Sequence, residues 1–234
     1  MARFSPQKQI PISHYYIGMV SWDEIDTVLL DMDGTLIDLN FDNTLWNEYI
    51  PRHYAAAQGI APRQASDLLY GKTMKNQTKI DYYSVDFWKQ RTRLDIDRLH
   101  HDLAYLIRYR PRAEAFIQYV RAKRRRAVIA TNAHPNSLGI KDTMTGLVCQ
   151  VDACYSAHQF GDAKEDLGFW GKLFDSELSD PERTLLVDDN EEVLDTAAKF
   201  GVRHVLTIAQ PDLCKPPRSG ARYPIINDFN DLMS

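Results

Sequence analysis

Short runs of apolar residues recur along the chain, and helical patterns separate the later runs. The runs are almost free of charged side chains, which is typical of strands buried on both faces of a parallel sheet. Strands that alternate with helices favour an α/β fold, so we expect a Rossmann-like parallel sheet flanked by helices. The predicted strands are residues 27–30, 127–130, 184–187 and 204–208, and the predicted flanking helices are residues 113–123, 135–145 and 191–200.

A long helical stretch interrupts this alternation between the first two predicted strands. It contains no convincing strand, although a crossover between parallel strands needs far fewer residues. The pattern therefore predicts an α/β core formed by residues 1–42 and 110–234, with an inserted α-helical domain at residues 43–109. We expect this domain to lie beside the carboxyl edge of the sheet. Its predicted helices are residues 43–58, 62–69, 82–91 and 96–108.

Composition narrows the choice of partners and compartment. The 28 basic and 32 acidic residues give a net charge of −4, which offers no field that would attract a nucleic acid polymer or an anionic membrane. Three cysteines without a C-x-x-C pair fit a reducing compartment. Residues 1–26 have neither a signal-peptide core nor a membrane-spanning run. We therefore expect a soluble, cytoplasmic protein.

Two carboxylates follow the first predicted strand. Asp31 and Asp33 lie two residues apart, and Gly34 and Thr35 come next. Because side chains alternate along an extended chain, both carboxylates can project toward one site at the carboxyl edge of the sheet, where ligands bind. The same residues would also serve as a turn that satisfies only its own backbone. Taken alone, the pattern favours the two interpretations equally.

Three later segments place polar residues at comparable points. Thr131 and Asn132 follow a strand and precede a helix, which suits either an anion site or an ordinary helix cap. Lys164 precedes another helix, where an isolated lysine is usually solvated. Asp188 and Asp189 end a further strand, and acids gathered at a strand end repel one another unless a cation lies between them.

The acids at these strand ends predict a metal site. Carboxylate oxygens are ligands that Mg²⁺ prefers, and Mg²⁺ commonly keeps water and substrate oxygens as its remaining ligands. We therefore expect Mg²⁺ to be bound by Asp31, Asp33 and Asp189.

The order of the four segments resembles the haloacid dehalogenase superfamily, and the helical insertion resembles that superfamily's type-1 cap. The resemblance covers the chain from residue 26 onward. It implies a Mg²⁺-dependent phosphomonoester hydrolase in which Asp31 forms a phosphoaspartate and Asp33 acts as acid and base. The other matching motif positions are Thr131, Asn132 and Lys164, which would bind phosphate, and Asp189 and Asp188, which would complete the metal site.

The same motifs look like the bacterial GMP/IMP 5′-nucleotidase branch of the superfamily. This branch implies a purine nucleoside monophosphate, GMP or IMP, as the substrate. Many relatives place proline after the motif lysine, whereas Glu165 follows Lys164 here, so the geometry of this loop is expected to differ. The stretches that carry the likeness are residues 31–39, 131–135, 158–161, 164–166 and 188–191.

Other functions use the same core. A phosphosugar phosphatase or a β-phosphoglucomutase-like phosphomutase needs the same motif residues. A catalytically silent phosphate-binding scaffold would keep the fold without turnover. Asp33 argues against carbon–halogen cleavage, since dehalogenases of this fold lack an acid at that position and have no phosphoester oxygen to protonate.

Substrate selectivity is expected to come from the insertion, because the core motifs contact only phosphate. Tyr82, Tyr83 and Trp88 are candidates for contacts with a nucleobase. Aromatic residues at helical spacing more often form the core of a small helical domain. Packing is therefore the competing explanation for each of the three.

Overall fold

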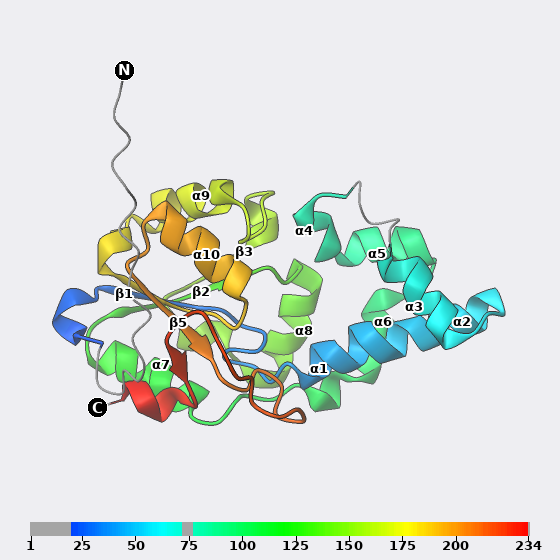
Figure 1. The fold of residues 1–234 in the computed structure, drawn as a ribbon, viewed down its shortest axis with the longest axis horizontal. Coiled ribbons are helices and arrows are strands. Elements are labelled where there is room, and N and C mark those ends of the chain that lie inside the picture. Colours follow the sequence, from blue (N-terminus) through cyan, green and yellow to red (C-terminus); the bar gives the residue numbers. More distant parts are fainter. Residues whose placement is uncertain (1–19, 72–76, 234) are drawn as a thin grey trace, which may run out of the picture.

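A computed structural model describes residues 20–71 and 77–233, and its centre is a parallel sheet (Figure 1). The order of the six strands is β3-β2-β1-β4-β5-β6, which confirms the predicted α/β class. In the central part of the sheet, Leu30 pairs with Ile129 on one side and with Val187 on the other. The strands are β1 (Thr27–Leu30), β2 (Arg126–Thr131), β3 (Ala153–Ser156), β4 (Thr184–Val187), β5 (His204–Ile208) and β6 (Ile225–Ile226).

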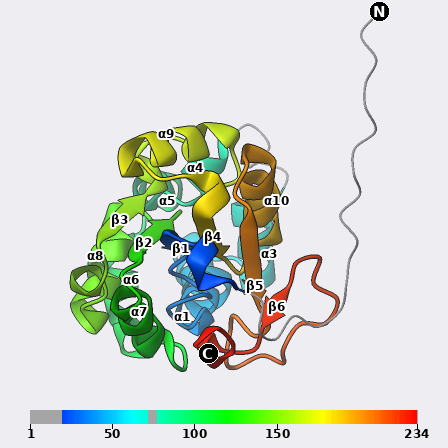
Figure 2. The same cartoon turned by 90° about the vertical axis from the view of Figure 1, so that its left-hand side faces the viewer.

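Helices cover both faces of the sheet, with α9 and α10 on one side and α7 and α8 on the other (Figure 2). Successive side chains of β1 alternate between these faces, so Leu29 packs beneath α9 and α10, whereas Val28 and Leu30 join the opposite cluster. This two-sided burial explains why the strands contain almost only apolar residues. The flanking helices are α7 (Ala113–Ala122), α8 (Pro135–Thr145), α9 (Leu167–Glu177) and α10 (Glu191–Phe200).

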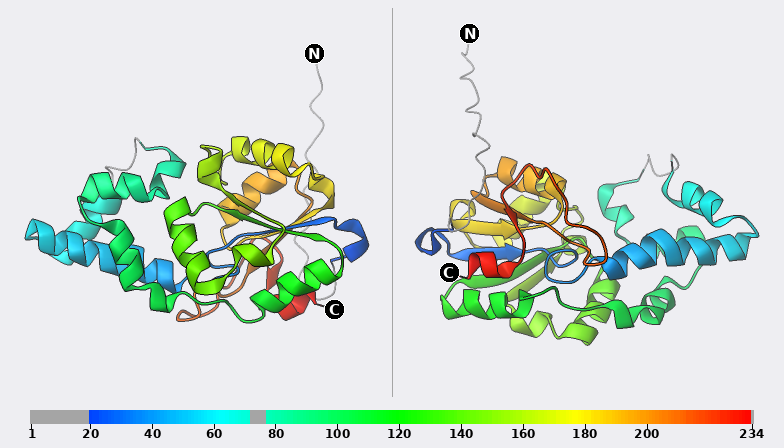
Figure 3. Two further views of the ribbon diagram at one scale, coloured as in Figure 1. Left: turned by 180° about the vertical axis from the view of Figure 1, so that it is seen from behind. Right: turned by 60° about the horizontal axis from the view of Figure 1, so that its bottom comes forward.

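The chain between β1 and β2 is helical and lies beyond one end of the strands (Figures 1 and 3). Its first helix runs without a break through α1, a π-helical stretch at Leu45–Tyr49, and α2, and it begins earlier than predicted. The helix predicted over residues 82–91 begins at Val85, because the Ser84 hydroxyl caps α5 by accepting a bond from the Phe87 N–H, and Tyr82 instead ends a separate helix, α4. The helices are α1 (Asn40–Thr44), α2 (Ile50–Gln58), α3 (Pro62–Tyr70), α4 (Lys79–Tyr82), α5 (Val85–Thr92) and α6 (Ile96–Asp102).

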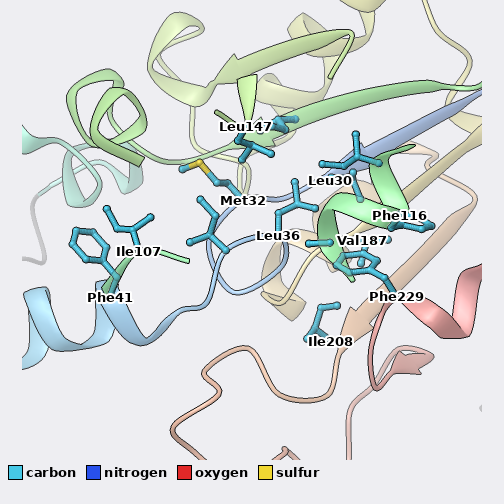
Figure 4. Close-up of a cluster of buried hydrophobic side chains, with 14 of the residues drawn as sticks. Leu30, Met32, Leu36, Phe41, Ile107, Phe116, Leu147, Val187, Ile208 and Phe229 are labelled. Carbon is cyan, nitrogen blue, oxygen red and sulfur yellow. The ribbon is translucent and has the colours of Figure 1, made fainter. Parts of the chain in front are cut away.

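One hydrophobic cluster joins this helical insertion to the sheet. Phe41 and Ile107, at the two connections to the insertion, lie near Met32 and Leu147, and the cluster continues to Leu30 of β1 (Figure 4). All of these side chains are buried. The insertion is thus held against the carboxyl edge of the sheet by apolar packing as well as by its two connections.

The sequence pattern did not predict β3 and β6. Three of the four residues of β3 are only partly buried, so β3 does not form the continuous apolar run that identifies the central strands. β6 is two residues long. Both strands lie at edges of the sheet, where hydrogen bonding to one neighbour is enough to hold a short strand.

In the part of the chain that the structure describes, no helix combines the length and the apolar character needed to cross a bilayer. The sequence-based expectation for residues 1–26 falls mostly on residues 1–19, which lie outside the described residues.

Candidate active site

The turn after β1 sets the geometry of the site. The Asp31 N–H donates to the Val187 carbonyl at 3.0 Å, so Asp31 continues the sheet ladder to the carboxyl edge and is only 5% exposed. Gly34 has φ +86°, and a Cβ atom there would lie 2.6 Å from Asp189 Oδ2. Glycine is required at this position both by the positive φ and by the approach of the Asp189 carboxylate.

Lys164 is buried among oxygen atoms at the centre of the site. Its Nζ lies 2.5 Å from Asp31 Oδ1, 2.7 Å from Asp188 Oδ2 and 3.0 Å from the Ala130 carbonyl. These three partners use all three N–H donors of the ammonium group. Lys164 is 2% exposed, and its pKa is raised by the two carboxylates in spite of burial. The structure therefore brings together three residues that lie far apart in the sequence.

Thr131 and Asn132 lie next to this lysine at the end of β2. The Thr131 hydroxyl accepts a bond from the Ala133 N–H at 3.0 Å, which leaves its hydrogen available to a ligand. The Asn132 side-chain carbonyl accepts a bond from the backbone N–H of Lys164 at 2.9 Å. Both residues line the cavity described below, and α8 begins just after them. A hydroxyl and N–H groups near a helix start suit an anion.

Three carboxylates lie close enough together to hold one metal ion. An oxygen atom from each of Asp31, Asp188 and Asp189 lies within 4.8 Å of the others. Burial, followed by the neighbouring carboxylates, raises the pKa of Asp31 well above its usual range. Burial and Asp188 raise the pKa of Asp189 to about 7. A divalent cation would relieve the cost of this arrangement, and a set of oxygen ligands fits Mg²⁺.

Asp33 does not belong to this group of three among the described residues. Its Oδ1 instead lies 2.7 Å from Nζ of Lys141, a lysine that the sequence analysis did not select. Lys141 also contacts both carboxylate oxygens of Asp42 at 2.9 Å. The sequence feature that could have identified Lys141 is its position on the buried face of α8, together with Ser137 and Ile140. That Asp33 also binds the metal stays a prediction.

Glu165 connects the core motifs to the insertion. Its carboxylate accepts bonds from the side-chain amide of Asn132 at 2.9 Å, from that of Asn190 at 3.2 Å and from the Tyr83 hydroxyl at 2.6 Å. Nζ of Lys79, in α4, donates to the Glu165 backbone carbonyl at 3.1 Å. Glu165, the residue that departs from the motif pattern, is therefore buried and connects the core motifs to the insertion.

A cavity of about 590 Å³ lies between the strand ends and the insertion. Its size falls within the range for small-molecule sites, about 300–1,000 Å³. Tyr82 and Tyr83 line it, whereas Trp88 is not among its lining residues. Trp88 is 1% exposed and donates through its ring N–H to the Tyr82 carbonyl at 2.8 Å, so it packs inside the insertion. Arg218, which the sequence analysis also missed, lines the cavity and donates to the Asp189 carbonyl at 2.8 Å.

Solved structures share this fold. The HAD phosphatase from Thermococcus onnurineus matches with a TM-score of 0.71 and 17% identity, over 89% of this chain and 96% of that chain. A putative β-phosphoglucomutase from Thermotoga maritima matches with a TM-score of 0.63 and 14% identity, over 89% of this chain and 97% of that chain. Likeness at such low identity shows the architecture and says nothing of the substrate.

Sequence comparisons are more specific. The chain is 35% identical over 214 residues to the GMP/IMP nucleotidase YrfG of Escherichia coli (strain K12), an alignment that covers 92% of this chain and 96% of that protein. The protein of the same name from Shigella flexneri matches with the same identity and coverage. Residues 25–201 match the family model of haloacid dehalogenase-like hydrolases. With the site geometry and the fold, these matches show that the chain is an enzyme that belongs to the haloacid dehalogenase-like hydrolase family.

Proposed function

We propose that this hydrolase is a Mg²⁺-dependent phosphomonoesterase that releases phosphate from purine nucleoside 5′-monophosphates, GMP and IMP. The observation that carries the proposal is the buried contact of Lys164 with Asp31 at the carboxyl edge of the sheet, beside the carboxylates of Asp31, Asp188 and Asp189. The substrate is supported by the 35% identity to a GMP/IMP nucleotidase along nearly the whole of both chains.

We further propose that the chain is organised as a core of residues 1–42 and 110–234 with a cap of residues 43–109. Support comes from the helices of the insertion, which provide one wall of the cavity while the strand ends provide the other.

The three cysteines are unpaired, which supports a cytoplasmic location because disulfides are rare there.

Asp31 is the proposed nucleophile. One of its carboxylate oxygens forms a bond to phosphorus while the bond from phosphorus to the 5′-oxygen breaks, and the product is a phosphoaspartate. A carboxylate that approaches a phosphate dianion meets like-charge repulsion. Lys164, 2.5 Å from Asp31, supplies a fixed positive charge at that point, and Thr131 is placed to donate to a phosphoryl oxygen.

Asp33 is the proposed acid and base. Burial, followed by Asp42, raises the pKa of Asp33 to about 6, so part of the population carries a proton near neutral pH. Asp33 first donates this proton to the departing 5′-oxygen. It then accepts a proton from the water that attacks phosphorus and releases phosphate from Asp31. The two transfers return both aspartates to their starting states.

Asp31, Asp188 and Asp189 are the residues that would hold Mg²⁺, since an oxygen atom of each lies within 4.8 Å of the others. When bound, the ion supplies charge neutralisation for the phosphoryl oxygens. Arg218 donates to the backbone carbonyl of Asp189, which fixes the loop that carries this ligand.

A substrate panel tests the proposal. Phosphate release is measured for GMP, IMP, pyrimidine nucleoside monophosphates and phosphosugars, each with and without Mg²⁺. We expect GMP and IMP to have the highest kcat/KM, and only with Mg²⁺. A preference for phosphosugars would contradict the substrate and leave the chemistry intact. Interconversion of phosphosugars without phosphate release would indicate a mutase, and no release from any monoester would indicate a binding scaffold.

A further inference from the structure

Lys141 is a buried cation in the wall of the site to which the proposed reaction gives no role. It lies on α8, is 1% exposed, and its ammonium group lies 5.4 Å from the centre of the Phe41 ring. Its Nζ contacts Asp42 Oδ1 and Oδ2 at 2.9 Å each and Asp33 Oδ1 at 2.7 Å. The two contacts with Asp42 are hydrogen bonds, and the contact with Asp33 is a close ion pair.

These contacts fix the position of the Lys141 ammonium group relative to Asp33. Asp42 is part of α1, which leads from the core into the insertion, and it holds Nζ through both of its oxygens. The positive charge of Lys141 is thereby fixed beside Oδ1 of Asp33, and Oδ2 is the Asp33 oxygen left for proton transfer. Lys141 lines the cavity, and its ion pairs with Asp42 and Asp33 hold its ammonium group in the cavity wall.

We propose that Lys141 is a positioning residue that holds Asp33 so that its carboxyl group can protonate the leaving oxygen of the substrate. The inference rests on the proposed phosphomonoesterase activity and deepens it. In the step concerned, the bond from Asp31 to phosphorus forms, the bond from phosphorus to the leaving oxygen breaks, and the proton moves from Asp33 to that oxygen. Lys141 exchanges no proton in this step and keeps the carboxyl group in place.

A pair of substrates separates this role from a general structural one. The alkoxide leaving group of an alkyl phosphate requires a proton, whereas the phenolate that leaves p-nitrophenyl phosphate does not. The ratio kcat/KM reports the steps up to formation of the phosphoaspartate, so it is not affected by the later role of Asp33 as a base. We expect Lys141→Met to lower kcat/KM for GMP by about 10²-fold, the lower end of the range for a general acid, and for p-nitrophenyl phosphate by less than about tenfold.

Two further variants make the test decisive. Lys141→Met in an Asp33→Asn background is expected to cause no further loss with GMP, because the lysine acts through that carboxyl group. Arg126→Met is the matched control, since it also removes the cation beside a buried carboxylate, that of Glu177, but at the opposite edge of the sheet. It is expected to leave the ratio of the two substrates unchanged.

Equal losses with both substrates, or a further loss in the Asp33→Asn background, would overturn the proposal. If Lys141→Met fails to fold, Lys141→Arg retains the charge with a different donor geometry, and the proposal requires it to shift the substrate ratio in the same direction. The alkyl phosphate used in this comparison is the one in the substrate panel that the wild-type enzyme hydrolyses fastest, which we expect to be GMP. A wrong assignment of GMP would then appear in the wild-type panel and would not be confused with a failure of the Lys141 proposal.

Discussion

The two walls of the cavity are built from different kinds of side chain. The wall at the strand ends consists of charged groups that are buried and paired with one another, such as Lys164 with Asp31 and Asp188. The wall from the insertion presents Tyr82 and Tyr83, on and just after the short helix α4, and Tyr82 is 48% exposed. Fixed charges suit a chemical step that is the same for every phosphomonoester. An exposed aromatic ring at the end of a short helix suits contacts that differ between substrates.

This difference predicts that changes in the first wall abolish turnover, whereas changes in the second alter the response to particular substrates. Asp31→Asn should give the largest effect, a loss of about 10⁴-fold or more in kcat, because the nucleophile is removed while the volume of the side chain is kept. Phosphate release from GMP is the measurement, and unfolding temperature is the control for folding. Appreciable activity in this variant would remove Asp31 as the nucleophile.

Removal of the metal should give the next largest effect. Treatment with a chelator is expected to lower kcat by about 10³-fold, since the charge of the three carboxylates would then oppose the attack on phosphate. Added Mg²⁺ should restore the rate. The binding of Mg²⁺, measured by calorimetry, should weaken in Asp189→Asn and remain in the control variant Arg126→Met. Full activity in the presence of the chelator would contradict the metal assignment.

The interior of the insertion should respond to pH through His100. This ring is buried against Phe41 and Trp46, and burial lowers its pKa to about 4. An unfolded histidine has a pKa of about 6.5, so between these values only the unfolded state binds the proton. Stability is therefore lost as the pH falls from about 6.5 to about 4, by up to about 3 kcal/mol.

Denaturant unfolding at several pH values measures this loss. His100→Gln should remove most of the dependence in that range, because glutamine does not titrate. The exposed neighbour His101 provides the matched control, and His101→Gln should leave the dependence as it is. An unchanged pH dependence in His100→Gln would show that the insertion is more hydrated than its packing indicates.

The smallest effect should come from the contact between the two walls. Tyr83→Phe removes the hydroxyl that donates to Glu165, a bond to a charged acceptor that is worth about 1.5–3 kcal/mol. We expect KM for GMP to rise by about tenfold with a smaller change in kcat, because the cap loses a contact and the phosphate-binding residues do not. Tyr82→Phe, which removes the adjacent hydroxyl, is the control. A loss of kcat comparable to that of Asp31→Asn would contradict the division between the walls.

The sequence was informative where position and chemistry are linked by the strand. Asp31, Thr131 and Asp189 each follow an apolar run, and the ends of parallel strands must meet at one edge of the sheet. The structure accordingly brings them together. Lys164 is not at a strand end, and its prediction depended on the order of the motifs.

Other parts of the site could not be predicted because no local pattern encodes them. Lys141 contacts Asp42 across 99 residues, and Glu165 contacts Tyr83 across 82 residues. Arg218 lies in the segment between β5 and β6, which contains neither a strand nor a helix. Such contacts depend on how the insertion packs against the core, and that packing is set by many side chains at once.

The most direct test of the proposed mechanism is to trap the phosphoaspartate. The enzyme is mixed with Mg²⁺ and GMP that carries a radiolabelled phosphoryl group, the reaction is stopped with acid within one turnover, and the protein is digested and analysed by mass spectrometry. We predict that the label is found on the peptide that contains Asp31, at Asp31 itself, and is absent from Asp31→Asn. Rapid release of phosphate with no label on the protein, or equal labelling of the variant, would contradict it.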